Sequence, residues 1–198
     1  ISAIQDSIFQ LYDKRMELFP STSKKPNNDC IILAYKASDY YRFYKKDGAA
    51  EANAMFKESV DCLGAESSPA TLSTYYVTSF YAMKGMEDEV AAKAKLGEML
   101  TEYLTLMDYV EQGIAAAEAA EDADAVEDYS KAKGHLDEVF IAIAQCKDMV
   151  PVLSEKVAAD TANFELKQKV LRLLNQKDCT DNDLYLPVAV EVHKAEPG

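Results

Sequence analysis

Four cysteines stand at spacings that could support chemistry. Cys30 and Cys62 are 32 positions apart, and Cys146 and Cys179 are 33 apart. Paired thiols form disulfides, and thiolates hold zinc or act as nucleophiles. Zinc fits poorly, because the chain has no Cys-x-x-Cys and neither His is spaced to join a thiolate pair. Two interpretations stay open: two disulfides, or four buried free thiols of the kind found in cytosolic cores.

The matched spacing favours disulfides, because each pair would close its own helical hairpin. Cys30 opens a predicted helix, and Cys62 lies in the last turn of the next, antiparallel one, so the two thiols meet at one end of the hairpin. Cys146 and Cys179 bear the same relation to the hairpin over 147–175. Two disulfides predict an oxidising compartment, such as a periplasm or a cell surface.

No other motif indicates catalysis or a cofactor. The chain lacks a Gly-rich phosphate loop, HExxH and GxSxG, and neither His135 nor His193 belongs to the Glu-x-x-His pairs of a di-iron bundle. Both histidines are expected at the surface. We therefore expect no enzyme activity, no cofactor and no metal centre.

The charge excludes several classes of partner. Among 198 residues, 34 are acidic and 21 basic, which gives a net charge of -13. A nucleic-acid binder or a polybasic lipid anchor needs the opposite sign. The longest apolar run, residues 139–144, is far shorter than the roughly 20 residues that span a bilayer, so we expect no membrane insertion.

The acidic side chains are concentrated in one region. Residues 87–128 contain 13 acidic and two basic side chains, whereas the rest of the chain is almost neutral. The simplest interpretation is a solvated surface. An alternative is an electrostatic contact for a basic partner, and a weaker one is a loose Ca²⁺ site at Asp122, Asp124 and Glu127/Asp128, which lacks the glycine and final glutamate of an EF-hand loop.

Apolar spacing predicts an all-α fold of eight or nine helices in a single domain, 1–198. The periodic segments are bounded by Pro, Gly and capping residues, such as Ser68-Pro69. Pro187 falls inside the last predicted helix, so we expect a kink there or a later start. The expected helices cover residues 2–19, 30–45, 49–63, 69–84, 87–119, 124–145, 147–159, 162–175 and 181–195.

Two hairpins have the length of a tetratricopeptide repeat. The spans 30–63 and 147–175 match its period, whereas the acidic pair at 87–145 is atypical. In the first hairpin, Ala52, Phe56 and Ser59 follow the small–aromatic–small pattern with which helix B of such a repeat packs against helix A. This pattern favours antiparallel hairpins stacked as a tetratricopeptide-like α-solenoid over a closed bundle.

Three segments, in order, resemble exported tetratricopeptide-repeat proteins of Bacteroidota: residues 11–20 (LYDKRMELFP), 169–174 (KVLRLL) and 178–185 (DCTDNDLY). The position of Cys146 and the terminal run 192–197, which ends in Pro, agree with this resemblance. It implies a periplasmic scaffold, with a signal peptide and more repeats outside this chain. The two chain ends, with helical spacing from the first residues onward, also lead us to expect a fragment of a longer protein; the alternative is a whole small protein with its leader removed.

Tyrosines mark the expected interaction surface. Seven cluster on two neighbouring helices and can pack in the core or line a groove. Tyr35, Asp39 and Arg42 lie off the apolar stripe of the second helix and are the candidate groove residues, where a rigid aromatic side chain would anchor a peptide. The hypothesis is a non-enzymatic scaffold for a partner protein or peptide. The alternatives are a structural spacer of a longer array and, less favoured, a helical small-molecule binder or enzyme.

Overall fold

The computed structural model describes residues 2–195, and this part of the chain is helical, apart from loops and one isolated β-bridge between Thr22 and Lys25. Short 3₁₀ turns, η1 (Lys45–Gly48) and η2 (Gly64–Glu66), follow two of the helices. The α-helices are α1 (Ser2–Leu18), α2 (Asn28–Tyr44), α3 (Ala49–Leu63), α4 (Pro69–Lys84), α5 (Glu89–Ala119), α6 (Ala123–Ile143), α7 (Cys146–Ala159), α8 (Phe164–Gln176) and α9 (Tyr185–Ala195).

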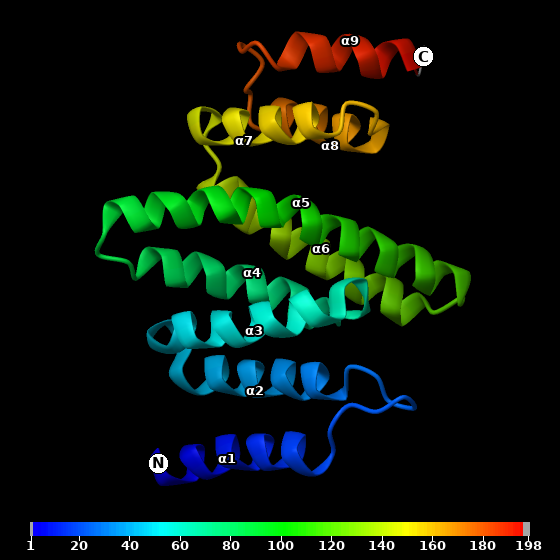
Figure 1. Ribbon diagram of the computed structural model, residues 1–198. Helices are drawn as coiled ribbons and strands as arrows, with labels where there is room; N and C mark the ends of the chain where they lie inside the picture. Colours follow the sequence, from blue (N-terminus) through cyan, green and yellow to red (C-terminus); the bar gives the residue numbers. More distant parts are fainter. Residues whose placement is uncertain (1, 196–198) are drawn as a thin grey trace.

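The helices form an elongated stack in which most pack on their neighbours in the chain, while α4 also packs on α6 and α7 also packs on α5. Figure 1 shows α1 to α4 layered from one end, the α5–α6 hairpin lying across the middle, and α7, α8 and α9 beyond it. Helix α5 contacts α4 and α6 on one side and α7 on the other. The two ends of the described chain therefore lie at opposite ends of the stack. In the described residues, no helix combines the length and the apolar character needed to cross a bilayer.

The two prolines of the C-terminal helices lie in different positions. The expected start of the last helix at residue 181 is wrong, whereas the later start that Pro187 indicates is confirmed: α9 begins at Tyr185, so Pro187 lies in its first turn, where its missing N–H has no helical acceptor. Pro151 lies inside α7, within the expected helix 147–159. Pro197, which ends the terminal run 192–197, lies outside the described residues.

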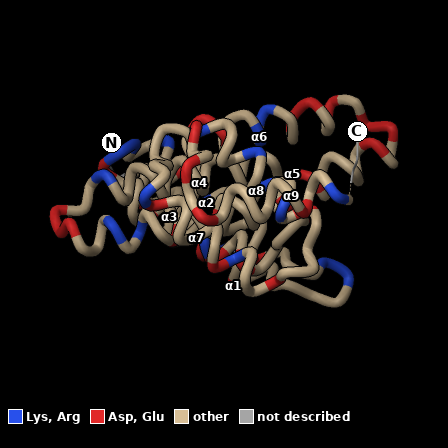
Figure 2. Tube along the Cα trace, turned by 90° about the horizontal axis from the view of Figure 1, so that it is seen from above, with Lys and Arg blue, Asp and Glu red and all other residues tan. Residues whose placement is uncertain are grey.

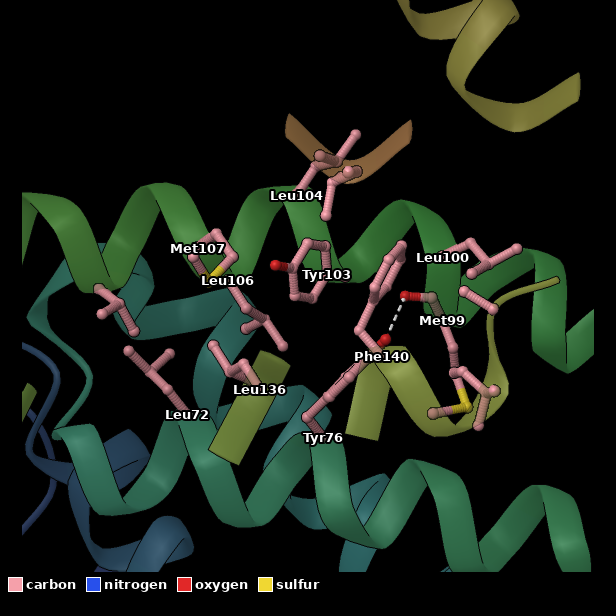
Figure 3. Packing of buried hydrophobic residues seen from close by; sticks show 14 of the residues in the cluster. Leu72, Tyr76, Met99, Leu100, Tyr103, Leu104, Leu106, Met107, Leu136 and Phe140 are labelled. Carbon is pink, nitrogen blue, oxygen red and sulfur yellow. Dashed lines mark hydrogen bonds between the residues drawn. The ribbon is translucent and has the colours of Figure 1, made fainter. Parts of the chain in front are cut away.

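The core runs through the stack and is centred on α5. The largest fully buried side chains include Tyr76 of α4, Tyr103 of α5 and Phe140 of α6. The ring of Tyr103 stacks on Phe140 with centroids 4.1 Å apart, and the Tyr76 hydroxyl donates to the Met99 carbonyl (3.1 Å), as Figure 3 shows. Tyr103 donates to Asp137, and burial together with this carboxylate raises the pKa of the Tyr103 hydroxyl. Each buried phenol thus has a hydrogen-bond partner.

The repeat-packing residues lie where helices α2 and α3 meet. Ala52, Phe56 and Ser59 are all fully buried. The Ser59 hydroxyl donates to the Cys30 carbonyl (2.7 Å), so this small side chain also bonds the two helices together.

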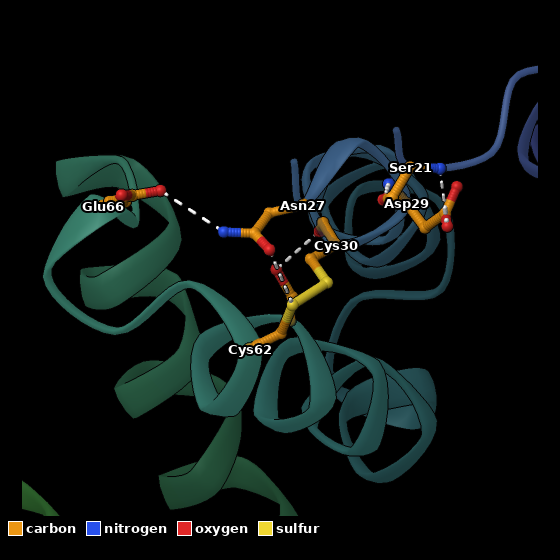
Figure 4. Close-up of a disulfide and its surroundings, with 7 residues drawn as sticks. Ser21, Asn27, Asp29, Cys30, Cys62 and Glu66 are labelled. Atoms are coloured by element: carbon orange, nitrogen blue, oxygen red, sulfur yellow. Dashed lines mark hydrogen bonds between the residues drawn. A yellow bond between two sulfur atoms is a disulfide. The ribbon is translucent and has the colours of Figure 1, made fainter. Parts of the chain in front are cut away.

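Both cysteine pairs are at disulfide distance, in the pairing that the spacing predicts. Cys30–Cys62 joins the start of α2 to the end of α3 (S–S 2.02 Å, Figure 4), and Cys146–Cys179 joins the start of α7 to the segment after α8 (1.97 Å). The packing of the two hairpins differs: α2 and α3 are in extensive contact, whereas α7 and α8 touch much less. The second disulfide therefore holds a hairpin that its own packing holds weakly.

The α5–α6 hairpin depends on one close approach. Gly113 of α5 is buried, and a Cβ built there would lie 2.3 Å from the ring of Tyr129 on α6. The Tyr129 hydroxyl continues across and donates to the Ser67 carbonyl (3.2 Å). Only a glycine leaves room for the ring this close to α5 at this position.

Two Gly-to-Ala substitutions in α5 should have opposite effects. Gly113→Ala should destabilise the protein by about 1–3 kcal/mol, because the new methyl group overlaps the Tyr129 ring. Gly97→Ala, where a Cβ would meet nothing within 4 Å, should stabilise it by about 0.5–1 kcal/mol through helix propensity. Urea unfolding midpoints measure both. A shift of the same sign in both variants would refute the close-approach argument.

Removal of the disulfides should distinguish the two hairpins. Replacing both cysteines of either pair by Ser should cost about 2–4 kcal/mol. In Cys146→Ser/Cys179→Ser, we expect the amides of α8 to lose hydrogen-exchange protection, because α7 packs weakly on α8. In Cys30→Ser/Cys62→Ser, the amides of α2 and α3 should stay protected by the core around Phe56. Equal loss of protection in both hairpins would contradict this account.

Candidate functional site

A groove of about 840 Å³ separates α5 from α8. Throughout the described residues, no Cα atom of α5 comes within 8 Å of one in α8, so only side chains span the gap. The α5 wall carries Leu104, Thr105, Asp108, Glu111, Gln112 and Ala115. The opposite wall carries Asn163, Glu165, Leu166, Gln168, Lys169 and Arg172 of α8 and its capping residue, with Lys156 from α7.

Helical spacing places the side chains of the α5 wall on one face of the helix. Asp108, Glu111 and Ala115 are three and four positions apart, so they lie along one face of the helix. The neighbouring face buries Met107 and Val110 in the core. Burial of that face fixes the rotation of α5 and so directs the two carboxylates toward α8.

The same argument places Lys169 on the α8 wall. The Asn163 side chain caps α8 by accepting from the Leu166 amide (2.9 Å). Val170, Leu173 and Leu174 of this strongly amphipathic helix are fully buried. Their burial leaves Lys169 on the face toward α5.

One lysine bridges the groove. Lys169 Nζ contacts carboxylate oxygens of both Asp108 and Glu111 (2.7 Å to Glu111), and Glu111 also lies 3.4 Å from Lys133 of α6. Burial by itself would raise the pKa of Glu111, but the two lysines outweigh it and hold that pKa below its ordinary value. Burial would likewise lower the pKa of Lys169, and the two carboxylates raise it instead. Both directions favour the charged pair.

Beyond the groove, α5 and α6 project past their neighbours. Helix α5 has 31 residues, against 16 in α4, and the far end of the hairpin extends beyond the stack in Figure 1. This end is acidic in Figure 2. We call the four exposed carboxylates nearest the α5–α6 turn the acidic ledge; they are Glu118, Glu121, Asp122 and Asp124.

The expected groove on α2 is partly occupied by α1. Asp39 accepts a hydrogen bond from the Tyr12 hydroxyl of α1 (2.8 Å), and burial with this bond raises the pKa of Tyr12 to about 12. Arg42 lies 3.9 Å from the Asp39 carboxylate, and Tyr35 is 55% exposed. Tyr35, Asp39 and Arg42 thus share a face of α2, but its central carboxylate already serves helix packing.

The tyrosine cluster is divided between two tasks. Tyr40 and Tyr44 pack against Phe9 of α1, with ring centroids 5.1 and 6.1 Å apart, and so dock α1 on α2. Tyr75 and Tyr76 are buried in α4. Core and helix packing therefore account for these four.

The remaining candidates for chemistry are dispersed. His135 and His193 are exposed. The Asp122 side chain caps α6 by accepting from the Ala125 amide (3.0 Å). One carboxylate of the alternative Ca²⁺ site therefore already has a hydrogen-bond donor. Among residues 2–195, no three His, Cys, Asp or Glu side chains are grouped as metal ligands would be.

No pattern in the sequence predicts the groove. Lys169 lies 61 residues from Asp108, and no local pattern links them. One usable signal existed: Asp108 and Glu111 are adjacent on a helix face with no Lys or Arg within four positions, so a cation had to come from elsewhere or from solvent.

Comparisons with known proteins identify no relative: no family model matches the chain, and neither the curated proteins nor the solved structures include a match.

The Lys169 bridge should contribute to stability in a pH-dependent way. Lys169→Met should destabilise the protein by about 1 kcal/mol at pH 7, because it leaves Asp108 without a partner and Glu111 with Lys133 alone. A lowered carboxylate pKa stabilises the fold above the unfolded value of about 4.3, and this contribution is lost as pH falls through the folded pKa. The raised pKa of Lys169 keeps it charged until strongly alkaline pH.

The difference between wild type and Lys169→Met should therefore be constant from about pH 5 to pH 10 and shrink below about pH 4. Chemical denaturation across this range measures it. Lys57→Met, which removes an exposed pair with Asp61 on α3, is the matched control and should change stability by less than about 0.5 kcal/mol. An undiminished difference at pH 3 would show that the ion pairs are not its source.

Proposed function

We propose that this chain is a non-enzymatic interaction scaffold that holds a segment of a partner protein in the groove between α5 and α8. The observation that carries the proposal is the gap itself. The long helix α5 in the middle of the stack stays apart from α8 in the next layer, and a lysine bridge and a row of polar side chains occupy the space between them. Helical segments of partners commonly bind in grooves of this kind.

The groove has the chemistry of a protein-binding surface. Its walls carry a few apolar groups, such as Leu104 and Leu166, among charged and amide groups. Non-obligate interfaces are about as apolar as the rest of a protein surface, so a polar groove is compatible with protein binding. The proposal replaces the α2 surface around Asp39 as the main site, because α1 already uses that carboxylate.

We further propose a tetratricopeptide-like solenoid of the exported Bacteroidota type. Support comes from the packing of most helices on their chain neighbours, and from the hairpins α2–α3 and α7–α8, which carry disulfides with sequence separations of 32 and 33. In this proposal the α5–α6 hairpin is an insertion between repeat-like units. Paired cysteines favour a periplasm or the cell envelope.

A second candidate is a structural spacer of a longer array. The outer faces of the first and last helices expose apolar side chains, with Ile4, Leu11 and Leu18 at seven-residue intervals on α1 and Leu186 and Val190 on α9. Further stacked helices would cover both faces.

Selection from a random peptide library separates the two candidates. The wild-type chain should enrich peptides that a groove-blocked variant, Thr105→Trp/Ala115→Trp, does not bind. Both positions line the groove and are exposed, so the tryptophans fill it without entering the core.

The control variant carries tryptophans at exposed positions outside the groove, Ala54→Trp/Ala94→Trp, and should retain the selected peptides. Circular dichroism melts of all three proteins exclude misfolding as the cause of lost binding. Peptides that bind the groove-blocked variant equally well, or no enrichment at all, would reject the groove as a binding site and leave the spacer.

A further inference from the structure

We infer that the partner segment is apolar or neutral where it lies in the α5–α8 groove, and that it extends out of the groove onto the acidic ledge with a basic part. This inference rests on the proposed function and adds the chemistry of the partner. The site is the groove, and the charge along α5 decides what fits it.

Groove and ledge form one continuous track along α5. The groove wall ends at Ala115, and Glu118 of the ledge follows three positions later. From Leu104 to Ala119 the helix is about 22 Å long, at roughly 1.5 Å per residue. A partner helix of about 15 residues would cover this length. Small side chains such as Ala115 and Ala119 let it approach closely.

The charge on this track is of one sign. Residues 108–128 contain eight acidic side chains and no Lys or Arg. Four of the eight have a cation from another position: Asp108 and Glu111 contact Lys169, while Glu127 and Asp128 contact Lys131. The four carboxylates of the acidic ledge make no ion pair within residues 2–195.

The uncompensated charge is therefore outside the groove and not within it. Inside, the lining holds three acidic side chains (Asp108, Glu111 and Glu165) and three basic ones (Lys156, Lys169 and Arg172), so the groove carries no net charge. A segment that is apolar or neutral in the groove and carries Lys or Arg where it leaves over the ledge matches both parts. An acidic segment would be repelled by the ledge, and an uncharged one would leave it unpaired.

The test uses the full chain and two synthetic 18-residue amphipathic peptides with identical Leu and Ala positions, one with Lys and the other with Glu at the polar positions. Fluorescence anisotropy gives the Kd of each at several salt concentrations. The Lys peptide should bind at least about tenfold more tightly at low salt, and the ratio should shrink as salt screens the exposed charges.

Two charge-neutralised variants locate the effect. Glu118→Gln/Glu121→Gln/Asp124→Asn should weaken binding of the Lys peptide about tenfold while sparing Asp122, which caps α6. The matched control, Asp47→Asn/Glu51→Gln/Glu58→Gln, removes the same charge from exposed positions at the α2–α3 end and should have little effect. A charge-reversed ledge, Glu118→Lys/Glu121→Lys/Asp124→Lys, should prefer the Glu peptide.

Each outcome decides one claim. If neither peptide binds, if both bind equally, or if ledge and control variants lose affinity equally, the inference of a basic partner is wrong. If binding depends on the groove-blocking tryptophans but not on peptide charge or the ledge, the proposed function stands and this inference falls. If binding depends on the ledge but survives groove blocking, the groove function and the continuous track both fall.

Discussion

Burial of α5 in the middle of the stack is the constraint on which the rest of the structure depends. In a linear stack each layer touches only the layers next to it, so an element in the middle must connect the first layers to the last. Helix α5 does so by packing on α4, α6 and α7 at once. Tyr103 is at the centre of this contact, between Tyr76 and Phe140. Glycine at position 113 then brings α6 close enough to complete the layer.

The same helix creates the surface that we assign to binding. Because α5 is about twice as long as α4, its last turns extend beyond the stack and cannot be buried there. Because this extension is exposed to solvent, polar side chains cover it, and here they are carboxylates. Where α5 still faces α8, the gap leaves room for a ligand, and Lys169 holds the walls in register without closing it. The gap between α5 and α8 thus forms the groove, and the extra length of α5 forms the acidic ledge.

The two disulfides join hairpins whose helices pack to different extents. The α2–α3 hairpin has its own core around Phe56, and the Ser59 hydroxyl bonds to the Cys30 carbonyl beside the cross-link. The α7–α8 hairpin, which supplies one wall of the groove, has less contact between its helices and contains Pro151. Cross-linking that hairpin limits how far the wall can move, because a disulfide restricts the conformations open to the chain.

The sequence by itself determined the helices, the cysteine pairing and the clustering of acidic side chains in one region. Each of these depends on residues close along the chain or on a simple hairpin geometry. Apolar spacing placed most helix ends within a few residues. It left the start of α9 open, because Pro187 is compatible with a first turn as well as a kink, and the structure has the later start. Only the tertiary structure decided which helices stay apart. The α5–α8 gap and the Lys169 bridge join residues about 60 positions apart, and such contacts depend on how whole layers pack, which no local period encodes.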